Sequence, residues 1–152
     1  MKIESQRERF KKTFNVSCET MVVFDSYLKI LVEEQKKTNL VGSGTLSSIW
    51  SRHFFDSAIL LDIIQSNLKT TKSKKFYDLI DVGTGAGFPG LVLSILFFEK
   101  KLNFRVCLLD SNNKKILFLN KIVSTLGLKV NIINERAENL KNKTFDFVVS
   151  RA

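Results

Sequence analysis

The sequence predicts an α/β protein with a parallel sheet, preceded by a helical region. Three observations carry this prediction. Short apolar runs alternate with helical segments from Lys75 onward, a cluster of glycines follows the first apolar run, and the residues before it show only helical periodicity. Strands separated by helices form right-handed βαβ units, whose strands are parallel. We therefore expect a Rossmann-like sheet of about four parallel strands.

The helical region is expected to span residues 1–66. Apolar residues recur at helical spacing from Glu19 to about Lys37 and again from about Leu46 to Gln65. The run Gly42-Ser43-Gly44-Thr45 separates these two helices. Residues 67–75 are polar and rich in lysine, which predicts a basic loop between the helical region and the sheet.

Residues 76–152 are expected to form a partial α/β domain that ends after its fourth strand. The predicted strands are Phe76–Val82, Phe104–Leu109, Lys129–Ile133 and Phe145–Ser150. The predicted helices run from Pro89 to about Lys100 and from Asn113 to about Leu126. Gly127 supports the second helix, because glycine commonly follows the last helical residue.

Composition and charge exclude several classes of protein. The longest apolar stretch, Leu91–Phe98, is shorter than the ~20 residues of a membrane span, and residues 1–12 have no apolar signal segment. Cys18 and Cys107 lie far apart and have no metal-binding spacing, so we expect no metal, no disulfide framework and a cytoplasmic location. The net charge of +9 favours a polyanionic partner such as nucleic acid.

The glycine cluster is the main candidate for a ligand site. It reads Asp81-Val82-Gly83-Thr84-Gly85-Ala86-Gly87-Phe88-Pro89-Gly90 and lies where a strand passes into a helix. Open α/β sheets bind ligands at this edge, and glycines let a ligand approach the backbone. The run from Gly85 fits the dinucleotide pattern G-x-G-x-x-G, whereas the run from Asp81 fits D-x-G-x-G-x-G, typical of S-adenosylmethionine enzymes. A carboxylate before the turn repels a pyrophosphate and suits an ammonium group, so we favour the second pattern over the first and over a turn that binds nothing.

Two further segments point toward the same edge of the sheet. Asp110 follows the second strand, and a carboxylate there accepts hydrogen bonds from ribose hydroxyls. The alternative is a helix cap, but Ser111 or Asn112 can serve that purpose. Residues 135–138, Glu-Arg-Ala-Glu, follow the third strand and either reach an adenine or form a solvated turn.

Five blocks of residues are spread in order across nearly the whole chain: Arg52-His53-Phe54-Phe55-Asp56-Ser57, Asp81 to Gly90, Leu108-Leu109-Asp110-Ser111 with Lys114-Lys115 and Phe118-Leu119, Arg136-Ala137-Glu138, and Phe145-Asp146 with Ser150-Arg151-Ala152. In their order and spacing these blocks resemble the bacterial 16S rRNA guanine-N7 methyltransferases, also called the glucose-inhibited division protein B family.

The resemblance implies a class I methyltransferase fold, S-adenosyl-L-methionine as cofactor, and a substrate guanine in the decoding region of 16S rRNA. It places a set of residues around the cofactor. The set comprises Asp81 at the ammonium, the turn residues Gly83, Gly85, Gly87 and Phe88, Asp110 at the ribose, Ala137 and Glu138 at the adenosine end, and Arg151 closing the site.

The family's reaction explains why the chain shows no catalytic base. Guanine N7 carries a free lone pair, so the reaction needs no general base and depends on positioning. The positioning candidates are Arg52, His53 and Arg151. His53 is either a hydrogen-bonded core residue or part of the site, and Arg52 either pairs with Asp56 four residues later or faces the substrate.

One departure from the family affects the expected activity. Family members are longer and have a seven-stranded sheet of order 3-2-1-4-5-7-6, so by this resemblance we expect the chain to be C-terminally truncated, as a fragment, a truncated gene product or one piece of a split gene. We therefore expect the chain alone to be weakly active or inactive. The alternatives are a nicotinamide-dependent oxidoreductase that uses the same turn and a non-catalytic basic RNA-binding protein.

Overall fold

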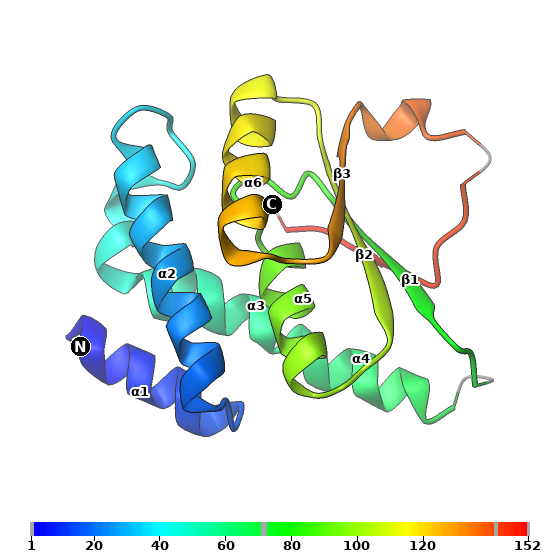
Figure 1. Cartoon of the computed structure of the whole chain (residues 1–152), viewed down its shortest axis with the longest axis horizontal. Helices are drawn as coiled ribbons and strands as arrows, with labels where there is room; N and C mark the ends of the chain where they lie inside the picture. Colours follow the sequence, from blue (N-terminus) through cyan, green and yellow to red (C-terminus); the bar gives the residue numbers. More distant parts are fainter. Residues whose placement is uncertain (1, 71–72, 142, 152) are drawn as a thin grey trace.

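The computed structural model describes residues 2–70, 73–141 and 143–151, which form a helical layer beside a parallel sheet (Figure 1). The sheet has the order β3-β2-β1-β4, and every pairing in it is parallel. Its strands are β1 (Tyr77–Val82), β2 (Phe104–Asp110), β3 (Val130–Asn134) and β4 (Phe147–Val149). This architecture confirms the predicted Rossmann-like sheet and its helical N-terminal region.

The register of the strands brings the candidate site together. Val82 at the end of β1 is level with Leu109, and Asp110 at the end of β2 is level with Asn134 at the end of β3. The loops that follow these three strands therefore leave the sheet side by side. In parallel sheets this carboxyl edge is the usual place of a ligand site.

Two helices connect the strands and pack on one face of the sheet. They are α5 (Gly90–Glu99), which contacts β2, and α6 (Asn113–Leu126), which contacts β3 and β2. The bounds of α6 are as predicted. The side chain of Asn112 caps it by accepting from the amides of Lys114 and Lys115, and Gly127 ends it in the left-handed conformation at φ 63°.

The N-terminal region begins with two α-helices and continues in shorter segments. The α-helices are α1 (Ile3–Thr13) and α2 (Cys18–Gln35); the shorter segments are η1 (Ser43–Ser48), η2 (Trp50–Phe55), α3 (Asp56–Ala58) and α4 (Leu60–Leu68). The predicted helix from Leu46 to Gln65 is helical throughout, but it is not a regular α-helix: its turns change from 3₁₀ to π at Trp50 and to α at Asp56. Helical turns also begin earlier, at Ser43, and extend to Leu68, two residues into the predicted basic loop.

The change of helix type lies beside an aromatic cluster. The segment η2 is a π-helix, whose wider turn places Trp50, His53 and Phe54 on the buried side. The Trp50 and Phe54 rings lie 4.6 Å apart, and both rings contact Phe10 of α1. Apolar spacing alone predicts a regular helix here, because it does not distinguish a π-turn from an α-turn.

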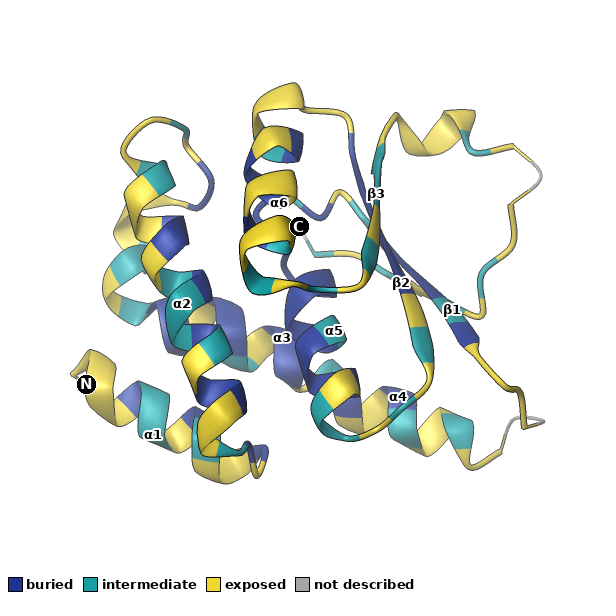
Figure 2. Ribbon diagram, viewed as in Figure 1, coloured by how far each residue is buried: buried dark blue, intermediate teal, exposed yellow. Residues whose placement is uncertain are grey.

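A single large apolar cluster joins the helices to one face of the sheet. It contains Phe24 and Tyr27 of α2, Leu96 of α5 and Leu108 of β2, all of which are buried. A smaller cluster around Ile80 and two residues of β2 covers the opposite face, packed by the connection between β3 and β4. Figure 2 shows that many of the buried residues lie in β1, β2 and α5. Within the described residues, no helix is both long and apolar enough to span a bilayer.

The two outer strands are the least buried part of the sheet. β3 and β4 alternate between half-buried and exposed residues, whereas most residues of β1 and β2 are buried. β4 is also shorter than predicted, because its ladder with β1 covers only Phe147–Val149. Single hydrogen bonds flank this ladder: the Asp146 amide donates to the Asp78 carbonyl, and the Ser150 hydroxyl donates to the Val82 carbonyl.

Candidate functional site

The first two glycines of the turn after β1 have backbone that is open to a ligand. Gly83 has φ 72° and Gly85 has φ 60°, a region that other residues adopt only with strain. A Cβ atom added to Gly83 would meet nothing within 4 Å. At Gly85 it would meet only the Gly83 carbonyl and the Lys115 ammonium, both at 3.9 Å. These positions therefore offer bare backbone beside free space.

The last two glycines of the turn are packed against the protein. A Cβ atom on Gly87 would lie 2.4 Å from Leu91 Cδ1 and 2.6 Å from the Tyr27 hydroxyl. On Gly90 it would lie 2.4 Å from Leu108 Cδ2 and 2.7 Å from Asp81 Oδ2. The cluster thus combines two functions of glycine: the first pair leaves space on the outside, and the second pair allows close packing on the inside.

Asp81 lies below the turn with no exposed surface. Its Oδ2 accepts from the Thr84 hydroxyl at 2.6 Å and from the Gly90 amide at 2.7 Å. Burial raises the pKa of Asp81 to about 6, although these two hydrogen bonds act in the opposite direction. Its Oδ1 is buried and has no hydrogen-bond partner in the described part of the chain, so one acceptor remains for a cation or donor.

Asp110 connects the turn to the end of β2. Its Oδ2 accepts from the Gly85 amide and its Oδ1 from the Asn112 amide, each at 2.9 Å. Since Asn112 caps α6, Asp110 does not have that role. Each carboxylate oxygen can accept two hydrogen bonds, so Asp110 keeps one free acceptor position on each oxygen.

A hollow of about 220 Å³ lies between the ends of β1, β2 and β3. The residues that line it include four of those predicted for the cofactor: Gly83, Asp110, Ala137 and Glu138. Ala137 and Glu138 belong to the short helix η3 (Ala137–Asn139) and are exposed. Predicted residues outside this hollow are Asp81, Gly85, Gly87, Phe88 and Arg151.

Arg151 does not line the hollow but contacts the other two positioning candidates, Arg52 and His53. Its guanidinium donates to the Arg52 carbonyl at 2.9 Å and to His53 Nδ1 at 2.5 Å. The guanidinium carbon also lies 5.3 Å from the centre of the buried Phe88 ring. The end of the chain after β4 is thereby attached to the N-terminal region beside the inner half of the turn.

These contacts define the state of the His53 ring. Because Nδ1 accepts from Arg151, Nε2 carries the proton, and it lies 2.9 Å from Thr45 Oγ1, whose own hydroxyl donates to the Gly42 carbonyl. Burial, together with the charges of Arg151 and Arg52, lowers the pKa of His53 to about 4. The imidazole is therefore neutral near pH 7 and acts as an acceptor that holds Arg151.

The alternative pairing of Arg52 with Asp56 is not found. In the described residues these two exposed side chains form no ion pair. Asp56 instead acts on Arg151, where its charge partly offsets the lowering of the Arg151 pKa by burial. The Arg52 side chain is left exposed beside the site.

Sequence reasoning missed two residues that hold the turn. Thr84 is buried and its hydroxyl donates to Asp81. Tyr27 of α2 is also buried and donates from its hydroxyl to the Ala86 carbonyl at 2.5 Å. Tyr27 lies within the helix predicted from Glu19 to about Lys37, whose spacing gives it no role in a site. No local pattern could connect it with a turn 59 residues later in the chain.

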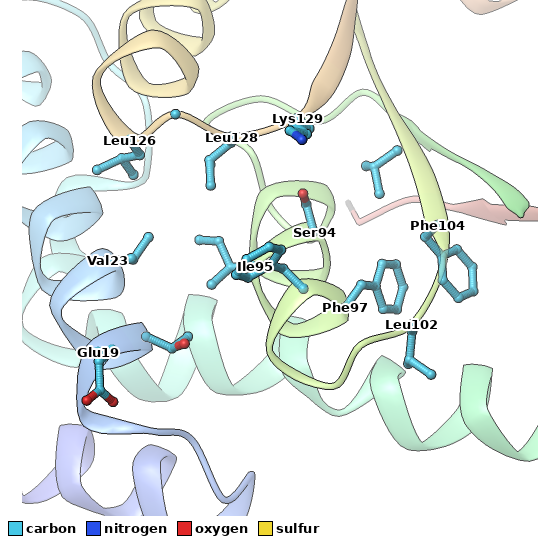
Figure 3. Close-up of a pocket in the computed structure, with 14 residues that line it drawn as sticks. Glu19, Val23, Ser94, Ile95, Phe97, Leu102, Phe104, Leu126, Leu128 and Lys129 are labelled. Atoms are coloured by element: carbon cyan, nitrogen blue, oxygen red, sulfur yellow. The ribbon is translucent and has the colours of Figure 1, made fainter.

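A second hollow, of about 410 Å³, lies away from the turn (Figure 3). It opens between α2, α5, the start of β2 and the junction of α6 with β3. Its lining is mostly apolar, with Val23, Ile95 and Leu128 facing one another and Glu19 and Lys129 among its few charged residues. None of the residues predicted for the cofactor lines it.

The parallel sheet, its helices and the glycine-rich turn at its carboxyl edge define a Rossmann-like α/β protein with a hollow between the ends of β1, β2 and β3. The family profile described as rRNA small subunit methyltransferase G matches residues 21–152. The chain belongs to this family, which confirms the resemblance found from its motifs and gives no support to the oxidoreductase or to a non-catalytic RNA-binding protein.

Two relatives with similar sequences agree with this assignment. The ribosomal RNA small subunit methyltransferase G of Mycoplasma capricolum is 40% identical over 93% of this chain, and the match spans 57% of that protein. The protein of the same name from Mycoplasma mycoides is 40% identical over 85% of this chain and 86% of its own length. A solved 16S rRNA N2 methyltransferase from T. thermophilus matches at TM-score 0.47 and 22% identity, over 63% of this chain and 24% of that one. The chain thus spans less than two thirds of the length of several relatives.

Proposed function

We propose that the chain binds S-adenosyl-L-methionine at the carboxyl edge of its sheet and acts in methyl transfer to N7 of a guanine in 16S rRNA. The observation that carries the proposal is the hollow beside the turn. Residues from three separate loops line it, and they include Gly83, Asp110 and Glu138. The names of the relatives support rRNA as the substrate and methylation as the reaction.

The geometry of the site supports a nucleoside with a cationic tail. The free acceptor positions of Asp110 suit two vicinal ribose hydroxyls, and Ala137 and Glu138 border the space for the base. The open backbone at Gly83 and Gly85 allows the ligand to pass close to the turn. The unpaired Oδ1 of Asp81 supports an ammonium group near this end of the site.

Bound S-adenosylmethionine would supply an activated methyl group, so the residues of the chain need only to position the reactants. Neutral His53 holds the Arg151 guanidinium beside Phe88, and the Arg52 side chain remains exposed nearby. The three positioning candidates, Arg52, His53 and Arg151, do not have to remove a proton from guanine N7, which presents a lone pair. We propose that they orient the RNA and close the cofactor site.

Two parts of the chain contribute to this function. Residues 76–152 would form the cofactor-binding domain, and residues 1–66 would support it across the basic loop 67–75. We further propose that the protein acts in the cytoplasm on the small ribosomal subunit or its precursor, with the net charge of +9 attracting the RNA.

Titration calorimetry with S-adenosylmethionine and, separately, with NADH tests the cofactor assignment. Saturable binding of S-adenosylmethionine with no heat from NADH is expected, and the reverse result would return the oxidoreductase to consideration.

For the substrate, the affinity of the chain for a 16S rRNA fragment should fall as the salt concentration rises, with a log–log slope of about −0.7 per neutralised phosphate of single-stranded RNA. Chemical strand scission at 7-methylguanine then reports methyl transfer. Binding of RNA without any scission would indicate a non-catalytic role.

A further inference from the structure

Tyr27 of α2 contacts three consecutive residues of the glycine-rich turn. Its hydroxyl donates to the Ala86 carbonyl at 2.5 Å and lies 2.6 Å from the position of a Cβ on Gly87. Its ring stacks on Phe88, with the ring centres 5.4 Å apart and the planes inclined by 12°. The side chain is completely buried. A residue of the N-terminal region therefore determines the position of the inner half of the turn.

The hydroxyl of Tyr27 remains a hydrogen-bond donor at neutral pH. Burial raises the pKa of Tyr27 well above its usual value, and the nearby charge of Asp81 acts in the same direction. A neutral donor next to a buried carbonyl is favourable, because a carbonyl without a partner there would carry an uncompensated desolvation cost.

The same ring is connected to the positioning residues. Phe88, stacked on Tyr27, lies under the Arg151 guanidinium, and its ring centre is 5.0 Å from that of His53. A shift of Tyr27 would move Ala86 and Phe88 together, and with them the backbone between Gly85 and the start of α5. The open glycines on the other side of the turn depend on that backbone for their position.

We propose that Tyr27 is a positioning residue for the cofactor turn: it acts through Ala86 and Phe88 to hold the backbone of Gly83 and Gly85 in the conformation that binds the ligand. This proposal rests on the proposed cofactor site. Tyr27 does not contact the ligand itself, because it lies on the buried side of the turn, so its effect must appear in cofactor affinity through the backbone.

The test compares two substitutions that each remove one tyrosine hydroxyl. Tyr27→Phe keeps the stacked ring and removes only the donor to Ala86. Tyr77→Phe is the control, because its hydroxyl lies at the amino end of β1, where it accepts from the Lys74 amide. Titration calorimetry with S-adenosylhomocysteine, at a temperature where both variants are folded, should show the dissociation constant rising roughly three- to tenfold for Tyr27→Phe, the effect of one hydrogen bond. The control should bind like the wild type.

A hydrogen-exchange measurement separates positioning from general stability. The amides of Gly87 and Phe88 both donate to the Thr84 carbonyl, at 2.9 and 3.0 Å, and should exchange faster in Tyr27→Phe while amides of β2 do not. If Tyr27→Phe fails to fold, Phe54→Leu replaces it, since that change removes the ring packed edge-on against Tyr27 at 5.3 Å and lies outside the predicted cofactor residues.

The outcomes are distinct. Weaker binding together with faster exchange confined to the turn supports the proposal. Wild-type affinity in Tyr27→Phe, or an equal loss in Tyr77→Phe, overturns it while leaving the cofactor site in place. If the wild-type protein itself gives no heat with S-adenosylhomocysteine, the proposed cofactor site fails, and the role of Tyr27 fails with it.

Discussion

The two halves of the glycine-rich turn use the same residue type for opposite purposes. In the outer half, Gly83 is exposed and Gly85 half-buried, and an added Cβ would find space. In the inner half, Gly87 and Gly90 are buried, and an added Cβ would come within 3 Å of neighbouring atoms. The difference teaches that a glycine motif need not mark ligand contact at every position. Substitutions in the outer half should impair binding, and those in the inner half should impair folding.

The largest effect is expected in the outer half, from Gly85→Val. A β-branched residue at φ 60° is strained, and its side chain would occupy the space of the ligand. Binding of S-adenosylhomocysteine should weaken by at least about 100-fold, or about 3 kcal/mol.

Gly127→Val is the matched control for this change. Gly127 has φ 63° and free space around it, but it ends α6 away from the turn. Both variants should lose similar stability in urea unfolding, and only Gly85→Val should lose binding. Equal losses of binding would mean that backbone strain, and not the ligand's space, accounts for the effect.

The next effect is expected in the inner half, from Gly90→Ala. The added methyl would press against Leu108 and against Asp81, which is hydrogen-bonded to the Gly90 amide and has little room to move. We expect a loss of about 3 kcal/mol in the free energy of unfolding, the upper part of the range for overpacking. Gly44→Ala, which meets nothing within 4 Å, should leave the stability almost unchanged. A stable Gly90→Ala protein with wild-type unfolding would remove the distinction between the two halves.

A smaller effect is expected for Asp110→Ala, which removes the carboxylate that supports the outer half. Loss of charge-assisted hydrogen bonds to the ribose should weaken cofactor binding by about 1–3 kcal/mol. Asp62→Ala, an exposed carboxylate of α4, is the control and should bind normally. If both variants bind alike, Asp110 serves only to hold the Gly85 amide.

The elements that could be predicted from sequence are those with strong local signals. The four strands and α6 follow from apolar runs, and Asn112 and Gly127 are common residues at helix ends. The turn was recognisable because its glycines come directly after a strand. The grouping of Gly83, Asp110 and Glu138 around one hollow followed from parallel topology, in which successive strand ends share one edge.

The remaining features depend on contacts between distant segments. The π-helix at Trp50–Phe55 is in aromatic contact with α1, and apolar spacing does not reveal it. The division of the turn into open and packed glycines depends on Tyr27, Leu91 and Leu108. Tyr27 belongs to α2 and Leu108 to β2, and both lie far from the turn in the sequence. The contact of Arg151 with His53 likewise joins residues 98 positions apart. Such features follow from tertiary structure and have no signature within a short window.

The smallest effect concerns the protonation of His53, whose ring lies against Phe88 of the inner half. Its folded-state pKa of about 4 is below the ordinary 6.5, so between these values the unfolded chain binds more protons and stability falls as the pH falls. Relative to His53→Gln, which keeps a polar side chain without this titration, the wild type should lose about 1 kcal/mol between pH 7 and about pH 5.5. Asp81, with its pKa raised to about 6, acts in the opposite direction but is present in both proteins and therefore cancels in the difference. Urea unfolding at the two pH values measures this difference. Parallel stability curves would show that His53 titrates normally, and the neutral acceptor assigned to Arg151 would be wrong.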